Sequence, residues 1–403
     1  MNDITEHKAQ ARPKYLTLCI LLMVPLTGMG IDLYAPSLPW IVSALHTTPE
    51  LVKLTIAMYL FGYAFGPLFA GTFSDTVGRR PTLIIGMVIY IAACVSTIVM
   101  PSIETMLAMR FLQGIGASFL AVCYRAMVTD SYDRGKDMQK MGAQVALAWS
   151  LGPVIAPFIG GYLQHYFNWQ ANFIFYIAYA VAMLGLAFVM PETNINKNKW
   201  APKKLFKQYR EIFSHRIFWG CVICMGAVYG MIVLFNVIGP FLIQDVLHYS
   251  AVDFGYIALI MGGGFLMGNL LNRYFVTRYS VKQLIQFGLF VSLAGFIVFL
   301  VLGYLYPVNL YAYFIPLFVS LMFSSFIFPN AMSTVLGLFP KMAGAASAMV
   351  GLTFSSITAL ATVMASYLPS ANQIPAAYAY IGITVVCAIF FYALMYRHLC
   401  KKS

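Results

Sequence analysis

Two opposite charges inside apolar stretches are the residues of this sequence best suited to chemistry. Asp32 lies in the run MGIDLYAPSLP at residues 29–39, and Arg110 lies in an apolar run that begins near Ile103. At 1.5 Å of rise per helical residue, each would sit about 9 Å below the same end of its helix. An unpaired charge at that depth costs several kcal/mol. We expect Asp32 and Arg110 to form either a protonatable pair beside a cavity or a static ion pair that holds two helices together.

The predicted helix around Arg110 carries a stripe of polar side chains. At 100° per residue, Gln113 and Tyr124 fall within about 60° of Arg110, and Arg125 lies about 60° away and some 22 Å further along. Such a stripe needs water, substrate or protein groups opposite it. Arg125 either continues the stripe or reaches out of the bilayer at its interface, with Asp130 as a candidate partner.

Further candidate cavity liners are mostly in the second half of the chain. Together with Gln113, Tyr124 and Arg125 we expect four other polar residues to line a substrate cavity: Tyr34, Tyr229, Asn236 and Asn330.

Small residues and prolines mark the fifth apolar run. Small side chains spaced four apart permit close helix contact, and each proline removes a backbone donor and bends the helix. The residues concerned are Gly152, Pro153, Ala156, Pro157, Gly160 and Gly161. Composition alone leaves two interpretations open, a hinge and simple tight packing.

The cysteines and histidines do not have the spacing of a metal or redox centre. The seven cysteines are scattered, and the lone C-x-x-C of Cys221 and Cys224 lies in an apolar run with no second pair, which favours packing. An intramembrane hydrolase would need a nucleophile or a metal set that the sequence does not offer. We therefore expect no enzymatic activity, no metal and no cofactor.

These residues must be held by helices that cross a membrane. The chain is 61% hydrophobic and only 9% charged, against roughly 25% charged in a soluble domain. Runs of about 20 apolar residues, long enough to span the hydrocarbon layer, recur along it. We predict an all-α membrane protein of twelve spans, which start near Tyr15, Glu50, Pro81, Ile103, Asp137, Asn168, Ser214, Val252, Val281, Val308, Lys341 and Ile374.

Lysine and arginine predict which side each loop faces. Apart from Lys53, Arg110 and Arg125, all of the 25 basic residues fall in every second gap between the apolar runs. This is the bias of basic cytoplasmic loops, and it predicts that both termini are cytoplasmic. It also explains the net charge of +12 without a nucleic-acid partner, because the charges form no single patch.

A polar stretch divides the chain into two halves. Residues 191–213 read as a cytoplasmic linker between a six-helix bundle at residues 14–190 and another at residues 214–398. A weak repeat supports the division, because Gly-x-x-x-Asp ends at Asp75 after the second run and Gly-x-x-x-Asn ends at Asn272 after the eighth. Two pseudo-symmetric bundles suggest a transporter that works by alternating access.

The motifs resemble those of the major facilitator superfamily along the whole chain. The segment GTFSDTVGRRP at residues 71–81 is similar to its loop motif G-x-x-x-D-x-x-G-R-[KR], and RFLQGIGA at residues 110–117 is similar to its motif R-x-x-Q-G-x-G. Residues 152–161 resemble the fifth-helix motif of its antiporters. The stretches at residues 32–39 and 124–130, and Gly160-Gly161 with the later Trp169, are similar to the bicyclomycin and chloramphenicol-resistance group of drug:proton antiporters.

The resemblance implies roles by position. Asp32 and Arg110 would be the proton-coupling pair, and Pro153 and Pro157 would shape a helix that prevents leak. A cytoplasmic gate would be formed by Gly71, Asp75, Gly78, Arg79 and Arg80. Some multidrug relatives carry a second acid about two turns before Asp32, where this sequence has Val24-Pro25, which argues against doubly charged cations as substrates.

We therefore predict a monomeric drug:proton antiporter in the lipid bilayer of a bacterial inner membrane, exporting amphipathic small molecules. The proton gradient would drive it. Two alternatives remain: a transporter dedicated to one metabolite, such as an anionic siderophore-like compound that the two intramembrane arginines would favour, and a transporter-like sensor or scaffold without flux.

Overall fold

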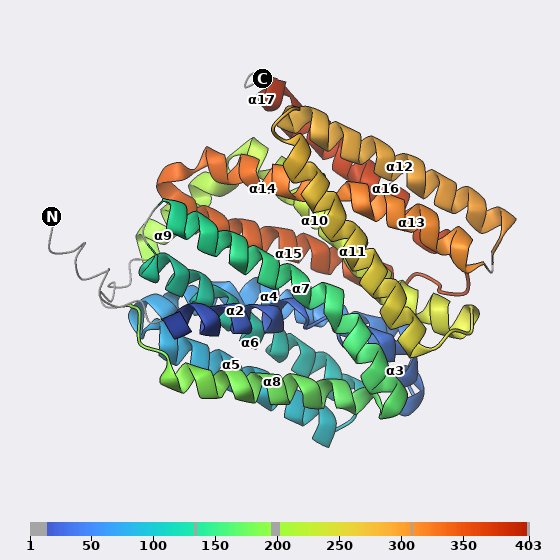
Figure 1. Cartoon of the computed structure of the whole chain (residues 1–403), viewed down its shortest axis with the longest axis horizontal. Helices are drawn as coiled ribbons and strands as arrows, with labels where there is room; N and C mark the ends of the chain where they lie inside the picture. The colour runs from blue at the N-terminus through green and yellow to red at the C-terminus, as the bar shows by residue number, and fades with distance from the viewer. Residues whose placement is uncertain (1–13, 133–134, 195–201, 308, 401–403) are drawn as a thin grey trace, which may run out of the picture. The chain divides into compact units, whose positions relative to one another are not determined.

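The computed structural model describes residues 14–132, 135–194, 202–307 and 309–400, and most of these residues are helical (Figure 1). None of them forms a strand. Eleven helices within these ranges are long and apolar enough to cross a membrane, and the shorter apolar helix Tyr15–Gly28 is a twelfth candidate. The predicted all-α membrane fold is confirmed, whereas the sidedness of the termini stays a prediction.

The first of two compact units is made of residues 1–34 and 58–200. Its helices are α2 (Lys14–Gly28), most of α4 (Pro49–Thr76), α5 (Arg79–Val99), α6 (Ile103–Ser131), α7 (Lys136–Tyr166) and α8 (Trp169–Val189). In Figure 1, α5 lies along α6 and α8, and α2 packs against α6, α7 and α8. The helix that carries Arg110 is therefore enclosed by its own unit.

The second unit is made of residues 35–57 and 201–403. Its long helices are α10 (Arg216–Phe241), α11 (Ala251–Phe275), α12 (Val281–Leu305), α13 (Leu310–Ser324), α14 (Ile327–Leu338), α15 (Ala343–Ser366) and α16 (Ile374–Phe390). Shorter elements complete it: η1 (Ala35–Ser37), α3 (Leu38–Ala44), α9 (Pro202–Phe213), η2 (Leu242–Val246), η3 (Pro340–Met342), η4 (Phe391–Met395) and α17 (Tyr396–Cys400). The centre of the unit is α10, which packs on α14, α15 and α16 and is almost entirely buried.

Residues 35–57 belong to the second unit although the chain on both sides of them belongs to the first. Lys53 anchors this segment: its fully buried ammonium donates hydrogen bonds to the carbonyl oxygen of Leu368 at 3.0 Å and to Ser370 Oγ at 2.6 Å. Gln244 holds it at a second point by donating to the carbonyl oxygen of Pro36 at 2.8 Å. Because these contacts join distant parts of the sequence, no local pattern marks the segment.

Local sequence sets several helix ends. Ser250 and Ser280 each form a capping box. The serine hydroxyl accepts from the backbone N–H three residues later, and the side chain of that later residue accepts from the backbone N–H of the serine. Asn168 caps α8 in a similar way by accepting from the backbone N–H of Ala171. Between α4 and α5, Gly78 has a φ of 129°, a conformation that side chains with a Cβ rarely adopt.

One sequence expectation about the helices was wrong, and two other segments have structure that the sequence analysis did not predict. The first apolar run does not continue as one helix through Asp32, because α2 ends at Gly28 and residues 29–34 form turns. The tenth run is split into α13 and α14 around residues 325–326. The expected linker at residues 191–213 contains a helix, α9, whose Ile212 is fully buried in the core of the second unit.

Candidate functional site

Arg110 lies at the centre of a buried cluster in the first unit. Its side chain is fully buried. Nη1 donates to Gln113 Oε1 at 2.5 Å, and Nη2 donates to the carbonyl oxygen of Gly30 at 2.7 Å. The guanidinium carbon is 4.4 Å from the ring centroids of both Tyr34 and Tyr59, so cation–π contacts add to the hydrogen bonds.

The break after α2 supplies the carbonyl that Arg110 binds. An interrupted helix leaves carbonyl oxygens without their usual partner four residues on. The carbonyl of Gly30 accepts from Arg110. That of Met29 keeps its bond from the backbone N–H of Leu33 at 3.2 Å and also accepts from the Tyr176 hydroxyl at 2.9 Å. Glycine is required at position 30, because a Cβ there would lie 2.1 Å from the Tyr59 hydroxyl oxygen.

Asp32 sits on this turn rather than on a helix. It is 4% exposed, and it interacts electrostatically with the hydroxyls of Tyr59 and Tyr176. Because the expected depth of about 9 Å assumed a continuous helix, that calculation does not apply to Asp32. The structure brings Arg110 to the turn through Gly30, two residues before Asp32, and the predicted pairing of their charged groups stays a prediction.

The small residues of α7 allow this turn to pack closely. A Cβ on Gly160 would lie 1.6 Å from the carbonyl oxygen of Leu33, and one on Gly152 would lie 3.0 Å from that of Pro25. Both glycines therefore admit the backbone that leads into and out of the Asp32 turn. The other members of the predicted motif, Pro153, Ala156, Pro157 and Gly161, lie in the same uninterrupted helix, and a role of the motif in antiport stays a prediction.

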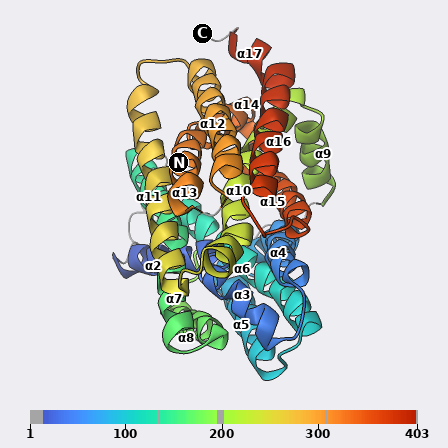
Figure 2. The same ribbon diagram turned by 90° about the vertical axis from the view of Figure 1, so that its right-hand side faces the viewer.

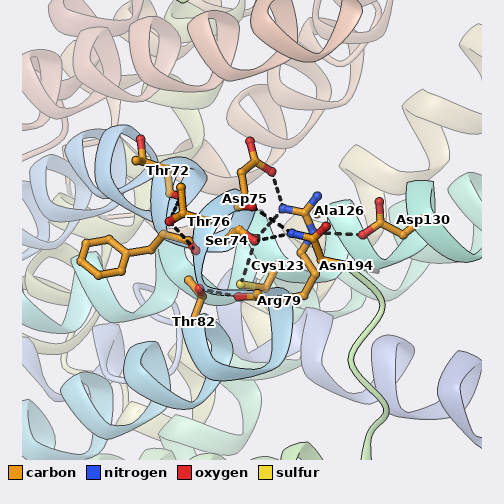
Figure 3. A network of polar contacts seen from close by, with 12 residues as sticks. Thr72, Ser74, Asp75, Thr76, Arg79, Thr82, Cys123, Ala126, Asp130 and Asn194 are labelled. Carbon is orange, nitrogen blue, oxygen red and sulfur yellow. Dashed lines mark hydrogen bonds and ion pairs between the residues drawn. The ribbon is translucent and has the colours of Figure 1, made fainter. Parts of the chain in front are cut away.

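A second polar cluster surrounds Arg79, where α5 begins (Figure 3). Nη1 of Arg79 donates to Asp75 Oδ1 at 2.5 Å and to Ser74 Oγ at 2.9 Å, and Nε donates to Asp130 Oδ2 at 2.9 Å. The arginine thus joins the end of α4 to the end of α6. Asp130 had been a candidate partner of Arg125, and the structure gives it to Arg79 instead.

The chain after α8 closes over the same cluster. Glu192 accepts from the backbone N–H of Arg79 at 2.9 Å and from that of Arg80 at 3.1 Å, so it caps the start of α5. The Asn194 side chain donates to the backbone carbonyls of Ser74 and Asp75, both at 3.1 Å. We call residues 192–194 the strap. Sequence reasoning missed it, although an acid directly after an apolar run was a usable signal.

The other gate-motif residues differ in how tightly they are held. The φ of 129° at Gly78 disfavours any residue with a Cβ, and a Cβ there would also displace the Glu192 carboxylate, whose Oε2 would lie 2.4 Å away. The Arg80 side chain donates to the carbonyl oxygen of Phe188 at 2.5 Å. Around Gly71, a Cβ would meet no atom within 4 Å, so packing in this structure does not explain that glycine.

The remaining predicted cavity liners are spread over both units. In the first unit Tyr124 is buried, whereas Arg125 is exposed and lies 5.7 Å from the Tyr124 ring centroid. In the second unit Asn236 and Asn330 are buried and Tyr229 is half-buried. Asn330 donates to Asn272 Oδ1 at 2.7 Å, a contact that ties α14 to α11. Their role as substrate contacts stays a prediction.

The histidine, cysteine and acidic side chains of the described ranges form no candidate metal centre. Among those residues, no group of three or more could hold a metal ion. The two clusters around Arg110 and Arg79 are therefore the arrangements on which a function can be argued.

Comparison with known proteins assigns the chain to a group. The model of the Major Facilitator Superfamily matches residues 20–362. The chain is 26% identical over 399 residues to the "Bicyclomycin resistance protein homolog" of Haemophilus influenzae, covering 96% of this chain and 97% of the relative. It is 27% identical over 273 residues to the "Multidrug transporter MdfA" of Yersinia pestis, covering 67% and 66% of the two chains.

Solved structures give the same fold. The E. coli xylose transporter XylE in a partially occluded inward open conformation aligns with a TM-score of 0.70 at 15% identity. The alignment covers 94% of this chain and 97% of that one. At this identity the likeness concerns the fold alone.

Proposed function

Because this chain belongs to the Major Facilitator Superfamily, we propose that it is a proton-coupled antiporter that exports amphipathic small molecules across a bacterial inner membrane. The multi-pass helical fold and the names of its relatives, a bicyclomycin resistance protein homolog and a multidrug transporter, support the proposal. The observation that carries it is the buried arginine fixed to the turn that holds Asp32. In this proposal the protein works without a cofactor, as a monomer, and performs no enzymatic reaction.

Proton coupling would act through the charge of Asp32. Desolvation disfavours a charged carboxylate, and a nearby cation favours it. A change in hydration or in the distance to Arg110 would therefore change how tightly Asp32 holds its proton. Since the turn and not a rigid helix carries Asp32, protonation can alter the turn's conformation, and proton and substrate then bind in alternation.

The turn is well placed to pass such a change along the chain. Asp32 lies two residues before Tyr34, where the chain leaves the first unit, and Ala35 begins the segment that belongs to the second. Within the cluster, Arg110 Nε and the Tyr59 hydroxyl are buried and make no hydrogen bond to other described residues. These groups remain available to a carboxylate, a proton carrier or water during the cycle.

Transport in proteoliposomes with an imposed proton gradient tests the proposal. The panel would contain cationic, neutral and anionic compounds, and the variant would be Asp32→Asn, which cannot exchange a proton. We expect the wild type to export against a substrate gradient and Asp32→Asn to lose uphill export while still inserting in the membrane. Glu104→Gln, which removes an exposed carboxylate from the start of α6, is the matched control and should transport normally. Undiminished proton-driven export by Asp32→Asn would reject the coupling role.

The substrate panel also decides between two substrate classes. With a single acid at the site and the fully buried Val24 where relatives carry a second, we expect neutral and singly charged compounds to be exported better than divalent cations. The charge of Arg125, an exposed residue whose side chain contacts Tyr63 and Tyr124, favours the second candidate, a transporter of an anionic, siderophore-like metabolite. Preferential movement of an anionic chelator, lost in Arg125→Gln, would support that candidate instead.

A further inference from the structure

The acids of the second unit are Glu50, Glu211, Asp245 and Asp253, which all lie before residue 254, whereas the cations continue beyond it. No aspartate or glutamate follows Asp253 in the sequence, whereas four arginines and lysines of the described chain gather where α11 ends, α12 begins and α17 lies: Arg273, Arg278, Lys282 and Arg397. Figure 2 shows the turn between α11 and α12 at the same end of the unit as α17. We call this region the basic end.

Apolar side chains at helical spacing lead up to the basic end. On α12 the exposed side chains include Phe287, Phe290, Ile297 and Val301, and Phe290 is 74% exposed. Large apolar side chains exposed along one face of a membrane-spanning helix face the acyl chains of lipids. The helix begins one residue before Lys282, so this lysine lies where the lipid-facing stripe ends.

Exposed stripes on the neighbouring helices end in the same region. On α11 the stripe runs through Ile260, Met267 and Leu270 to Tyr274, which is 53% exposed. After α16, Tyr392 is exposed and its hydroxyl accepts a hydrogen bond from Gln286 Nε2 at 3.0 Å. Tyrosine prefers the boundary between acyl chains and headgroups, so the basic end lies at the level of the headgroups.

Two of the four cations contact tyrosine rings. The guanidinium carbon of Arg278 is 4.5 Å from the ring centroid of Tyr274, and Nζ of Lys282 is 5.3 Å from that of Tyr396. Lys282 Nζ also donates to Cys400 Sγ at 3.6 Å, which uses one of its three donors. A ring contact itself orients a cation without using a hydrogen-bond donor. In the first unit, by contrast, the donors of Arg79 are taken up by Asp75 and Asp130.

We propose that the basic end binds the headgroup of an anionic phospholipid, with Arg278 and Lys282 as its phosphate contacts. Arginine matches phosphate oxygens with two parallel hydrogen bonds, and lysine adds a point charge. Juxtamembrane clusters of lysine and arginine are attracted to anionic lipids. The tyrosines and the stripes beneath them would contact the glycerol and acyl portions of the same lipid.

A lipid titration of the full chain in a neutral detergent tests this. Bound lipid is counted by native mass spectrometry while phosphatidylglycerol or phosphatidylcholine is added. We expect tighter binding of phosphatidylglycerol, and about tenfold weaker binding of it when Arg278→Gln and Lys282→Gln are combined, since two headgroup contacts are lost. Phosphatidylcholine binding should not change. Arg278→Lys, which keeps the charge but loses the paired hydrogen bonds, should retain only part of the affinity.

The matched control removes two other cations of the same unit. Lys207→Gln with Arg210→Gln changes the net charge equally, but on the exposed side of α9, and should bind phosphatidylglycerol like the wild type. If both double variants lost the same affinity for phosphatidylglycerol, net charge alone would explain the binding and the proposal would be wrong. Wild-type affinity in the Arg278 and Lys282 variant, or displacement of the lipid by millimolar inorganic phosphate, would also overturn it.

Discussion

The corresponding helices of the two units use different chemistry. In the first unit α6 carries Arg110, Arg125 and Asp130, and its end is tied to α5 by the ion pair of Asp130 with Arg79. In the second unit α13 and α14 contain no charged residue. Their tie to α11 is the neutral hydrogen bond between the side chains of Asn330 and Asn272.

The two six-helix repeats therefore share the arrangement of their helices but not the charged residues at corresponding positions. Asp75 and Asn272 end the same Gly-x-x-x motif, yet within the described ranges Asp75 accepts from an arginine and Asn272 accepts from the amide of Asn330. A charged tie responds to protonation and to the loss of its partner, whereas an amide pair does not titrate. We therefore expect the first unit to contain the responsive parts of the cycle and the second to be the more passive framework.

The largest effect is expected for Arg110. Arg110→Ala removes two hydrogen bonds and two ring contacts from a fully buried site, and should cost about 3 kcal/mol of stability together with nearly all transport. Arg110→Lys should recover only part of both, since lysine lacks the planar fork. Thermal unfolding in detergent and export assays measure the two effects. A fully active lysine variant would mean that charge alone is needed.

The second largest effect is expected when the ion pairs of Arg79 with Asp75 and Asp130 are broken. Arg79→Ala leaves Asp75 and Asp130 without their guanidinium and should lower stability by about 1–2 kcal/mol, since half of the Asp75 side chain is exposed. Arg80→Ala is the control, because that side chain reaches only the carbonyl of Phe188 among the hydrogen bonds of the described chain. If both variants unfolded at the same temperature, the network around Arg79 would not be the stabilising element.

Asn272→Asp would place in the second unit the acid that the first unit has at the corresponding position, Asp75. Asn272 is 5% exposed, so a charged carboxylate there would be desolvated with only an amide as partner, at a cost of about 1–3 kcal/mol. Because the protonated form avoids this cost, the variant should gain thermal stability relative to wild type as the pH falls from about 7 to about 4. Asn272→Ala should show no such pH dependence. A pH-independent Asn272→Asp would indicate that Arg273 or solvent compensates the charge.

The smallest effect is expected for the strap. Asn194→Ala removes two hydrogen bonds to the last carbonyls of α4 and should cost about 1 kcal/mol. Thr193→Ala, whose hydroxyl makes one long contact of 3.3 Å to Asp130, should cost less. Hydrogen exchange of the residues between α4 and α5 would report the loosening directly. Faster exchange in Thr193→Ala than in Asn194→Ala would contradict the role given to the asparagine.

Sequence reasoning located the charged residues because charges are rare in apolar runs. Asp32, Arg110, Arg79 and Asp75 all stand out by composition and spacing, and the helical fold follows from the length of the runs. The contact of Arg110 with the Gly30 carbonyl could not be foreseen, since it depends on the end of α2 at Gly28 and on the close approach of Tyr59 to Gly30 in three dimensions.

Contacts between residues far apart in the sequence were also missed by the sequence analysis. The strap and the anchoring of Lys53 join residues more than a hundred positions apart, and single-sequence periodicity carries no information about such pairs. The helix α9 was read as linker because polar residues dominate it, although Tyr209, Ile212 and Phe213 share one side that packs on the second unit. The helical spacing of these three apolar residues, rather than the composition of the segment, could have predicted this helix.

The place of residues 35–57 in the second unit changes what a cut in the polypeptide would do. The chain passes between the units after Tyr34, after Ala57 and after Trp200. Severing it near residue 200 would therefore leave an N-terminal fragment that still supplies α3 and Lys53 to the other fragment's fold. Two separately expressed halves divided there would be expected to reassociate through an exchanged segment. Halves redivided to omit residues 35–57 from the first fragment would lose that means of recognition.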